Sequence, residues 1–365
     1  MAITHVPTPI NEARVRHFLS DVADVFAKRP FNPHSLFKGG HAQTLAAYAW
    51  PRLFRFRTPA DEKRLFQVTL DTQVLAYCRW HPSPGDHPTI IIWHGIEGSS
   101  EAVYMLATAR KAFAAGFNVV RMNLRNCGDT EHLTPTLYHG GLTEDLRAVV
   151  AELIEHDQLK KVFIVGYSLG GNMVLKLAGE YGDDPPSGML GVCAVSPSVD
   201  LNASADLILQ RSNWLYHQDF LRRLKGRIAR KQKLFPDRYD TSEIRSIRNL
   251  RDFDDRYTSR AHGFDGAADY YNRASSIRVV DRIRVPTLII HGKDDPFIPF
   301  APLTDPRIAA NPYILLVAPP QGGHVAFVAS PTDGEDRFWA ENRVVEFCKL
   351  ADEEFGKADR QAAEE

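Results

Sequence analysis

A serine flanked by glycines is the feature of this sequence with the clearest chemical potential. Residues 166–170 read Gly-Tyr-Ser-Leu-Gly; an apolar, strand-like run precedes them and a helical pattern over residues 169–181 follows. Gly-x-Ser-x-Gly between a strand and a helix is typical of a nucleophile elbow, a tight turn that exposes the serine hydroxyl. The alternative is an ordinary glycine-rich turn. This context predicts that Ser168 is a nucleophile.

Two residues far downstream could activate that serine. A serine hydroxyl is a poor nucleophile until a base takes its proton, and the base needs a third group to orient it. Asp295 and His324 each lie just beyond a predicted strand, and the chain order is serine, aspartate, histidine. α/β-hydrolases have that order. We therefore predict that His324 is the general base and then the general acid, and that Asp295 holds its ring. The alternative for His324 is an ordinary polar loop residue.

Asp294 is a second candidate for the carboxylate. Asp295 is favoured because it lies four residues after His291 and four before Pro299. This His-Gly-x-x-Asp-x-x-x-Pro spacing is familiar in the α/β-hydrolase fold. Aspartate is also common in turns, so one of the two adjacent carboxylates is expected to stabilise a turn.

Acyl transfer also needs donors for the negative charge that develops on the carbonyl oxygen. In this fold one donor is the N–H of the residue after the nucleophile, here Leu169, and the other comes from the loop after the third strand. Residues 94–100 form that loop, and we predict that the N–H of Ile96 is the second donor. An interpretation compatible with this one is a glycine turn into a helix capped by the Ser100 side chain.

Alternating strands and helices must position these groups. Apolar runs predict strands at residues 65–70, 74–80, 89–93, 118–124, 161–166, 189–195, 285–291 and 313–318, and helical patterns cover 11–27, 101–115, 143–156, 169–181 and 337–350. This alternation predicts an α/β protein with a mostly parallel central sheet flanked by helices. We expect a helical and extended segment over residues 1–60 that packs on the core, a domain over 61–350 with a helical cap insertion at about 200–281, and a disordered tail over 351–365.

The cap insertion is rich in positive charge. Residues 211–233 contain eight basic residues and one acidic residue, Asp219. Apolar residues recur there at helical spacing, at Trp214, Leu221, Leu224 and Ile228. One hypothesis is a basic amphipathic lid that makes peripheral contact with anionic lipid or an anionic acyl carrier. The favoured interpretation is a solvated helix whose apolar side packs on the domain, because runs of charge usually only solvate a face.

Composition excludes several classes of protein. The chain has 365 residues, with 44 Lys and Arg against 45 Asp and Glu, so its formal charge is -1. A protein built to bind nucleic acid normally has a basic excess. No run reaches the 18 apolar residues of a membrane span, and the N-terminal residues carry no pattern of a secretory signal. We therefore expect no nucleic-acid partner, no transmembrane segment and a cytoplasmic location.

Cofactor motifs are absent from the sequence. The four cysteines are far apart and form no Cys-x-x-Cys pair, so reduced thiols are expected. No spacing in the sequence pairs Cys127 with a base that could make it a nucleophile, so Cys127 is expected in the pocket wall or core. His-Glu-x-x-His, Walker A and Gly-x-Gly-x-x-Gly motifs are also missing. We predict neither a metal nor another cofactor.

Several of these segments together resemble the YheT-like family of α/β-hydrolases. They are Asn-Pro-His at 32–34, Gly-His-Ala-Gln-Thr at 40–44, His-Gly-Ile-Glu-Gly-Ser at 94–99, Gly-Tyr-Ser-Leu-Gly-Gly-Asn at 166–172, Asp-Asp-Pro-Phe at 294–297 and Gly-Gly-His at 322–324. The resemblance covers residues 30–345 and implies a Ser168, Asp295 and His324 triad that hydrolyses a carboxylic ester. Many members read Arg-Gly-Cys-Ser-Gly where residues 125–129 here read Arg-Asn-Cys-Gly-Asp.

The sequence thus predicts a serine hydrolase that cleaves small-molecule or lipid esters through an acyl-enzyme. An acyltransferase or a thioesterase would use the same three residues with another acceptor or leaving group. A non-catalytic binding protein on a hydrolase scaffold is the alternative from a different class.

Overall fold

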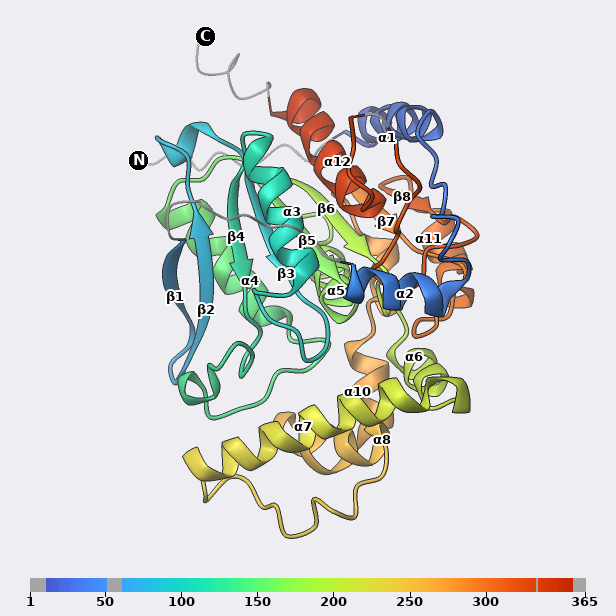
Figure 1. Ribbon diagram of the computed structural model, residues 1–365. Coiled ribbons are helices and arrows are strands. Elements are labelled where there is room, and N and C mark those ends of the chain that lie inside the picture. Colours follow the sequence, from blue (N-terminus) through green and yellow to red (C-terminus); the bar gives the residue numbers. More distant parts are fainter. Residues whose placement is uncertain (1–10, 51–60, 333, 357–365) are drawn as a thin grey trace.

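A single mixed sheet forms the centre of the protein. The computed structural model describes residues 11–50, 61–332 and 334–356, and within them eight strands pair in the order β1-β2-β4-β3-β5-β6-β7-β8 (Figure 1). The β1–β2 and β2–β4 pairs are antiparallel, whereas every other pair is parallel. The predicted α/β class is confirmed. The strands are β1 Glu62–Thr69, β2 Thr72–Arg79, β3 Thr89–Trp93, β4 Asn118–Met122, β5 Val162–Tyr167, β6 Met189–Val195, β7 Thr287–Ile290 and β8 Ile314–Val317.

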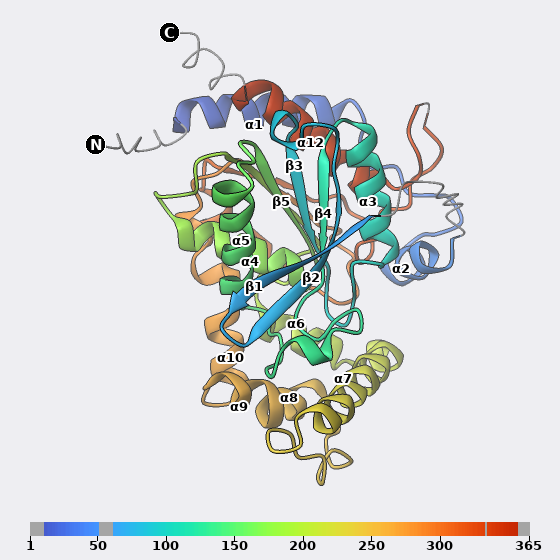
Figure 2. The same cartoon turned by 90° about the vertical axis from the view of Figure 1, so that its left-hand side faces the viewer.

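Helices cover both faces of the sheet. Helices α1, α3 and α12 pack together on one face, whereas α4 and α5 pack on the other (Figure 2). The central strands β3 to β6 are therefore buried at every position, which explains their continuous apolar runs. The α-helices are α1 Glu12–Ala27, α2 Gly40–Ala49, α3 Val103–Ala114, α4 Thr143–Ala151, α5 Leu169–Tyr181, α6 Leu201–Ile208, α7 Trp214–Leu234, α8 Leu250–Phe253, α9 Ser259–His262, α10 Ala267–Ala274, α11 Pro306–Ala309 and α12 Trp339–Phe355.

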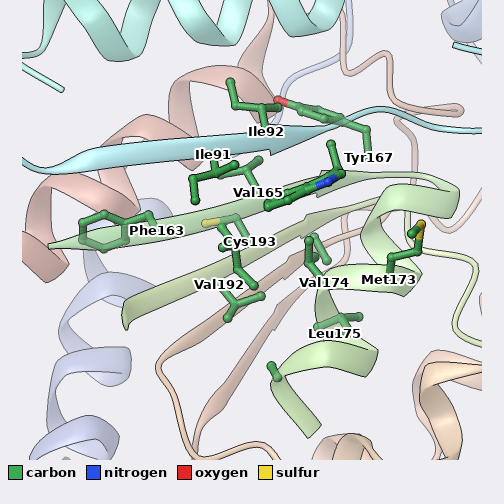
Figure 3. Packing of buried hydrophobic residues seen from close by; sticks show 14 of the residues in the cluster. Ile91, Ile92, Phe163, Val165, Tyr167, Met173, Val174, Leu175, Val192 and Cys193 are labelled. Atoms are coloured by element: carbon green, nitrogen blue, oxygen red, sulfur yellow. The ribbon is translucent and has the colours of Figure 1, made fainter. Parts of the chain in front are cut away.

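Interleaved side chains of neighbouring strands form the core. Figure 3 shows Phe163 and Val165 of β5 close to Cys193 of β6, with Val174 and Leu175 of α5 below them. All five are fully buried or nearly so. This packing holds the β5–α5 junction, and hence the serine at that junction, in a fixed position.

Register brings several loops to one edge of the sheet. Trp93 of β3 pairs with Gly166 of β5, Tyr167 of β5 pairs with Val195 of β6, and Val195 pairs with Ile290 of β7. Since these strands are parallel, their carboxyl ends lie side by side. The loops that follow them carry the predicted site residues, which therefore meet at this edge.

The insertion after β6 forms helices α6 to α10 beyond that edge (Figures 1 and 2). Leu221, Leu224 and Ile228 of α7 are buried in a second apolar cluster, which includes Ile298 from the loop after β7. Trp214 does not continue this buried stripe: it is the first residue of α7 and is 59% exposed. The stripe thus anchors the helix only from its second turn onward.

Three other details depart from the expectations. The segment Gly40–Ala49 is a helix, α2, which the sequence did not predict. Helix α3 begins at Val103 after Ala102, so Ser100 is not its N-cap. Residues 152–156, predicted as the last turns of a regular helix, form a short π-helical turn.

The predicted end of the last helix at about residue 350 is wrong, and the tail assigned to 351–365 begins too early. Helix α12 continues to Phe355 because Ala351 and Phe355 are buried. Residues 357–365 of that predicted tail lie outside the described residues.

Candidate active site

Ser168 lies at a strained turn between β5 and α5. Its φ of 54° is in the left-handed region, which non-glycine residues seldom adopt and which often marks functional sites. The neighbouring glycines are needed because a Cβ on Gly166 would lie 2.2 Å from the Gly170 carbonyl oxygen, and one on Gly170 would lie 2.6 Å from the His94 carbonyl oxygen. Tight packing therefore accounts for both glycines of the motif.

The structure brings Ser168, His324 and Asp295 together. His324 Nε2 lies 2.9 Å from Ser168 Oγ, and His324 Nδ1 lies 2.8 Å from Asp295 Oδ2. Because a carboxylate only accepts, Nδ1 carries the proton that it donates to Asp295. Nε2 is then free to accept the proton of the serine hydroxyl, which is the arrangement that activates a serine.

The Asp295 carboxylate is held from the opposite side by the backbone. Its side chain is fully buried, and Oδ1 accepts hydrogen bonds from the N–H groups of Phe297 (2.8 Å) and Ile298 (3.1 Å). Burial by itself would raise the pKa of this carboxyl, but the charge and hydrogen bond of His324, assisted by the backbone donors, hold the pKa below its usual value. Asp295 is thus oriented and ionised.

Asp294 does not contact the His324 ring by any hydrogen bond among the described residues. Its Oδ1 instead accepts from the N–H of Gly323 at 2.9 Å, and burial raises the pKa of its carboxyl. Of the two adjacent carboxylates, Asp295 orients the ring and Asp294 holds the loop on which the ring sits.

Helix α2 supports the same loop from the N-terminal segment. The N–H of His324 donates to Thr44 Oγ1 at 2.9 Å. The buried amide of Gln43 donates to the Val328 carbonyl and accepts from the Val328 N–H. These contacts escaped the sequence reasoning, although the Gly-His-Ala-Gln-Thr segment stood out in the family resemblance and could have signalled them.

In the loop after β3, the backbone N–H groups on either side of Ile96 are already hydrogen-bonded. The Gly95 and Glu97 N–H groups donate to the hydroxyls of Tyr104 and Tyr138, and that of Gly98 donates to Gly95 O. No described residue accepts from the N–H of Ile96. A Cβ on Gly95 would lie 3.4 Å from Ser168 Oγ, so this loop directly adjoins the serine.

Leu169 offers a second donor of the same kind. It is the first residue of α5, where an N–H has no partner within the helix, and no other described residue accepts from it. The predicted pair of donors therefore lies beside Ser168 with both N–H groups available.

The side chain of His94 holds the start of this loop through hydrogen bonds to the backbone. The fully buried ring donates from Nδ1 to the Gly95 carbonyl at 2.7 Å and accepts at Nε2 from the Leu124 N–H at 3.1 Å. Burial lowers the pKa of His94 to about 4, so the ring is neutral at neutral pH. It is a structural group rather than a base.

A cavity of about 100 Å³ extends from Ser168 beneath the cap. Its lining includes Ser168 together with Ile96 and Leu169. The remainder of its lining is mostly apolar and aromatic and comes largely from the cap helices; it includes Leu201, Ile208, Leu224, Leu250, Phe253 and Tyr270. Such a cavity suits an apolar group attached to the reacting carbonyl.

A buried ion pair joins the cap to the loop after β3. Arg227 Nη2 of α7 lies 3.0 Å from Glu97 Oε2, with side chains only 5% and 4% exposed. The other Glu97 oxygen accepts from Tyr138 Oη at 2.9 Å. Arg227 also donates to Cys127 Sγ at 3.2 Å, and burial raises the pKa of that thiol to about 11. Cys127 is thus a protonated core residue, one of the two places expected for it.

No group of three or more His, Cys, Asp or Glu side chains within the described ranges could hold a metal ion. Over the same ranges, no helix combines the length and apolar character needed to cross a bilayer.

The strand order, the elbow and the cap define a protein of the α/β-hydrolase class. A family model described as alpha/beta hydrolase fold matches residues 88–331. YheT of Escherichia coli (strain K12) is 31% identical over 330 residues, which cover 89% of this chain and 94% of that protein. The chain therefore belongs to the YheT-like family of α/β-hydrolases, and the resemblance seen in its motifs is confirmed.

Other relatives are similar over a smaller share of their length. Monoacylglycerol lipase of Saccharomyces cerevisiae is 31% identical over 73% of this chain and 60% of its own length. Phospholipase ABHD3 of Mus musculus is 26% identical over 72% of this chain and 64% of its own length. Among solved structures, the esterase Pf2001 of Pyrococcus furiosus has a TM-score of 0.51 at 16% identity, covering 82% of this chain and 97% of that one, which supports the fold.

Proposed function

We propose that the chain hydrolyses carboxylic esters through an acyl-enzyme formed on Ser168, with His324 as the base and Asp295 as its orienting carboxylate. Relatives named esterase, monoacylglycerol lipase and phospholipase identify the chain as an ester hydrolase. The observation that carries the residue assignment is the continuous chain of two contacts, 2.9 Å from serine to imidazole and 2.8 Å from imidazole to carboxylate.

The first half of the reaction forms the acyl-enzyme. Ser168 Oγ bonds to the ester carbonyl carbon while its proton passes to His324 Nε2, and the carbonyl electron pair moves onto oxygen. The N–H groups of Ile96 and Leu169 donate to that oxyanion. The C–O bond to the alcohol then breaks, and the alcohol leaves with the proton from Nε2.

Water completes the cycle by the same proton path. His324 takes a proton from water as the oxygen attacks the acyl carbonyl, and it returns that proton to Ser168 as the free acid leaves. Asp295 stays ionised throughout and stabilises the imidazolium that forms twice per turnover. The apolar cavity under the cap is positioned to hold the acyl group of a small-molecule or lipid ester.

Acyl transfer to an alcohol is the second candidate. A relative named medium-chain fatty acid ethyl ester synthase/esterase 2, from Saccharomyces cerevisiae, is 30% identical over 73% of this chain. An alcohol that attacks in place of water would give a new ester with the same proton transfers. Transfer that outruns hydrolysis when ethanol is added in water would favour this alternative.

The test is covalent labelling with a fluorophosphonate probe, read by intact mass, on the wild type and on Ser168→Ala. We expect one label on the wild type and none on the variant, with both proteins folded by circular dichroism. A folded wild type that takes no label would contradict the proposal and favour a non-catalytic binding protein on this scaffold.

A further inference from the structure

One carboxylate lies inside the acyl cavity, and the proposed reaction does not use it. Asp254 lines the same cavity as Ser168, but it belongs to the cap. It begins a short π-helical turn, Asp254–Thr258, which follows α8. Single π-helical turns are rare and frequently occur at functional sites, where they redirect side chains.

Within the residues that the structure describes, the side-chain oxygens of Asp254 accept hydrogen bonds from hydroxyl groups alone. Its Oδ1 accepts from Thr258 Oγ1 and its Oδ2 from Tyr271 Oη, each at 2.6 Å. A carboxylate can accept about four hydrogen bonds, so acceptor capacity is left on both oxygens. Asp254 lines the cavity and is a partly exposed residue, so an occupant of the cavity lies within reach of it.

No cation neutralises this carboxylate within the described part of the chain. Arg227, the arginine that lines the cavity, is held by Glu97 at 3.0 Å. Arg251, which is close enough to influence Asp254, is held by Asp206 at 2.6 Å. The other basic group in the lining, His139, is neutral because burial holds its pKa well below the usual value.

A carboxylate in such surroundings is costly to retain. Burial raises the pKa of Asp254 to about 6. The carboxylate form therefore predominates at neutral pH, at a cost in stability that a leucine or an asparagine would avoid. Buried charges are normally paired, so a ligand group that donates to this carboxylate would supply what the protein does not.

We propose that the cavity selects an acyl chain that carries a hydrogen-bond donor, a hydroxyl or an ammonium group, along its length, and that Asp254 accepts from it. Leu201, Leu250 and Phe253 would contact the methylenes on the way. This inference rests on the proposed ester hydrolysis and narrows its substrate class from plain acyl chains to chains bearing a polar donor.

The test compares matched p-nitrophenyl esters in the wild type, Asp254→Asn and Asp254→Leu. Each acyl chain, from butanoyl to dodecanoyl, is made with a terminal methyl, a terminal hydroxyl or a terminal ammonium. At the best length, the wild-type ratio of kcat/KM for donor over methyl should exceed that of Asp254→Leu by about 10- to 100-fold, as for hydrogen bonds to a charged group. Asp254→Asn should keep part of the preference for hydroxyl and lose any preference for ammonium. This variant therefore shows which of the two donors the cavity prefers.

Asp219→Asn is the matched control. It removes a cap carboxylate that pairs with Arg222 and Arg223 on α7 and does not line the cavity, so its ratios should equal those of the wild type. Equal ratios in the wild type and Asp254→Leu at every length would overturn the inference while leaving ester hydrolysis intact.

A second measurement separates this inference from the proposed function. Calorimetry with Ser168→Ala compares the binding of ω-hydroxy and ω-amino alkanamides with that of plain alkanamides, and it needs no catalysis. Tighter binding of a donor-bearing amide that is lost with Asp254→Leu supports the inference even if the wild type hydrolyses no ester. Equal binding of all the amides overturns it.

Discussion

At Ser168 the backbone conformation and the surrounding space both restrict the sequence. The left-handed φ lifts the hydroxyl out of the turn, and the turn closes only because Gly166 and Gly170 have no Cβ. The two effects have different consequences for mutation. Substitution of Ser168 by alanine removes the hydroxyl and keeps the turn, whereas substitution of either glycine displaces backbone.

Gly166→Ala should therefore destabilise the protein as well as inactivate it. Its Cβ would lie 2.2 Å from a backbone oxygen, and relief of that overlap must separate β5 from α5, at about 3 kcal/mol or more. Gly85→Ala is the control, since its nearest neighbour would be at 3.8 Å, and it should change the free energy of unfolding by less than about 0.5 kcal/mol. Urea denaturation measures both. Equal stability of the two variants would mean that the elbow is not tightly packed.

The adjacent aspartates should differ sharply in their effect on turnover. Asp295→Asn keeps the shape but removes the charge that holds Nδ1–H, so kcat should fall by about 10,000-fold, as triad carboxylates do elsewhere. Asp294→Asn retains an oxygen that can accept from Gly323, so kcat should fall by less than about 10-fold. The measurement is ester hydrolysis at saturating substrate. Similar losses in both variants would contradict the separate roles.

At the scale of elements, α7 is not simply a helix with unpaired basic residues facing solvent. Its basic residues reach acidic partners: Arg227 pairs with Glu97, and Arg230 pairs with Glu131 at 2.6 Å. Those partners are 130 and 99 residues away in sequence, so a local count of charge could not reveal them. The packing of Leu221, Leu224 and Ile228 agrees with the favoured interpretation of this helix. Contact with anionic lipid stays a prediction, checked by whether vesicle binding weakens as salt rises.

The Arg227–Glu97 pair should couple the cap to the loop that carries the Ile96 N–H. Removal of one partner leaves a buried charge unpaired, so Arg227→Met should cost about 3–5 kcal/mol in the free energy of unfolding and also lower kcat. Glu97→Gln removes the opposite charge. The double variant should lose less than the two single losses combined, because no unpaired charge is left.

A double-mutant cycle on stability and on kcat measures that coupling. Arg222→Met is the matched control, because Arg222 on the same helix is exposed and its ion pair among the described residues is with Asp219, also in α7. Strict additivity of the Arg227 and Glu97 changes would mean that the cap does not act on the loop through this contact.

Across the whole molecule, the bounds of strands and helices were predicted correctly where the local sequence determines them. The bounds of β3, α5 and β6 agree with the sequence patterns to the residue, because continuous apolar runs and a glycine turn encode them. Helix α2 escaped because Leu45 and Tyr48 are exposed, so its apolar residues follow no helical period. Its contacts to the His324 loop arise only after folding.

The same distinction applies to the candidate site. Ser168, Asp295 and His324 could be chosen from motif and chain order, since each follows a strand of a sheet whose topology was predictable. Gln43 and Asp254 could not, because their relevance depends on tertiary proximity to the His324 loop and to the cavity. Gln43 lies in a segment that the family resemblance singled out, but that resemblance did not show what the side chain contacts, and no motif surrounds Asp254.

The N-terminal segment closes the fold against its C-terminal helix. Buried residues of α1 recur at Val15, Phe18, Leu19, Val22 and Phe26. Helix α1 lies beside α12 (Figure 1). The Phe18 ring lies 5.6 Å from that of Phe347 and 5.0 Å from that of Phe355, both in α12. The chain after α1 leads to α2, and α2 holds the His324 loop. Loosening of α1 should therefore destabilise the whole structure, including that loop.

Phe18→Ala should accordingly lower the stability of the entire chain. Loss of a buried phenylalanine costs about 3–5 kcal/mol, and α12 also packs on β6 and β7, so the loss should appear in one cooperative transition. Tryptophan fluorescence, circular dichroism and fluorophosphonate labelling should all lose their native signal at the same lowered urea concentration. The exposed His17→Ala on the same helix should shift that midpoint little. A Phe18→Ala protein that loses helix signal first, with labelling unchanged, would show instead that α1 unfolds separately from the catalytic core.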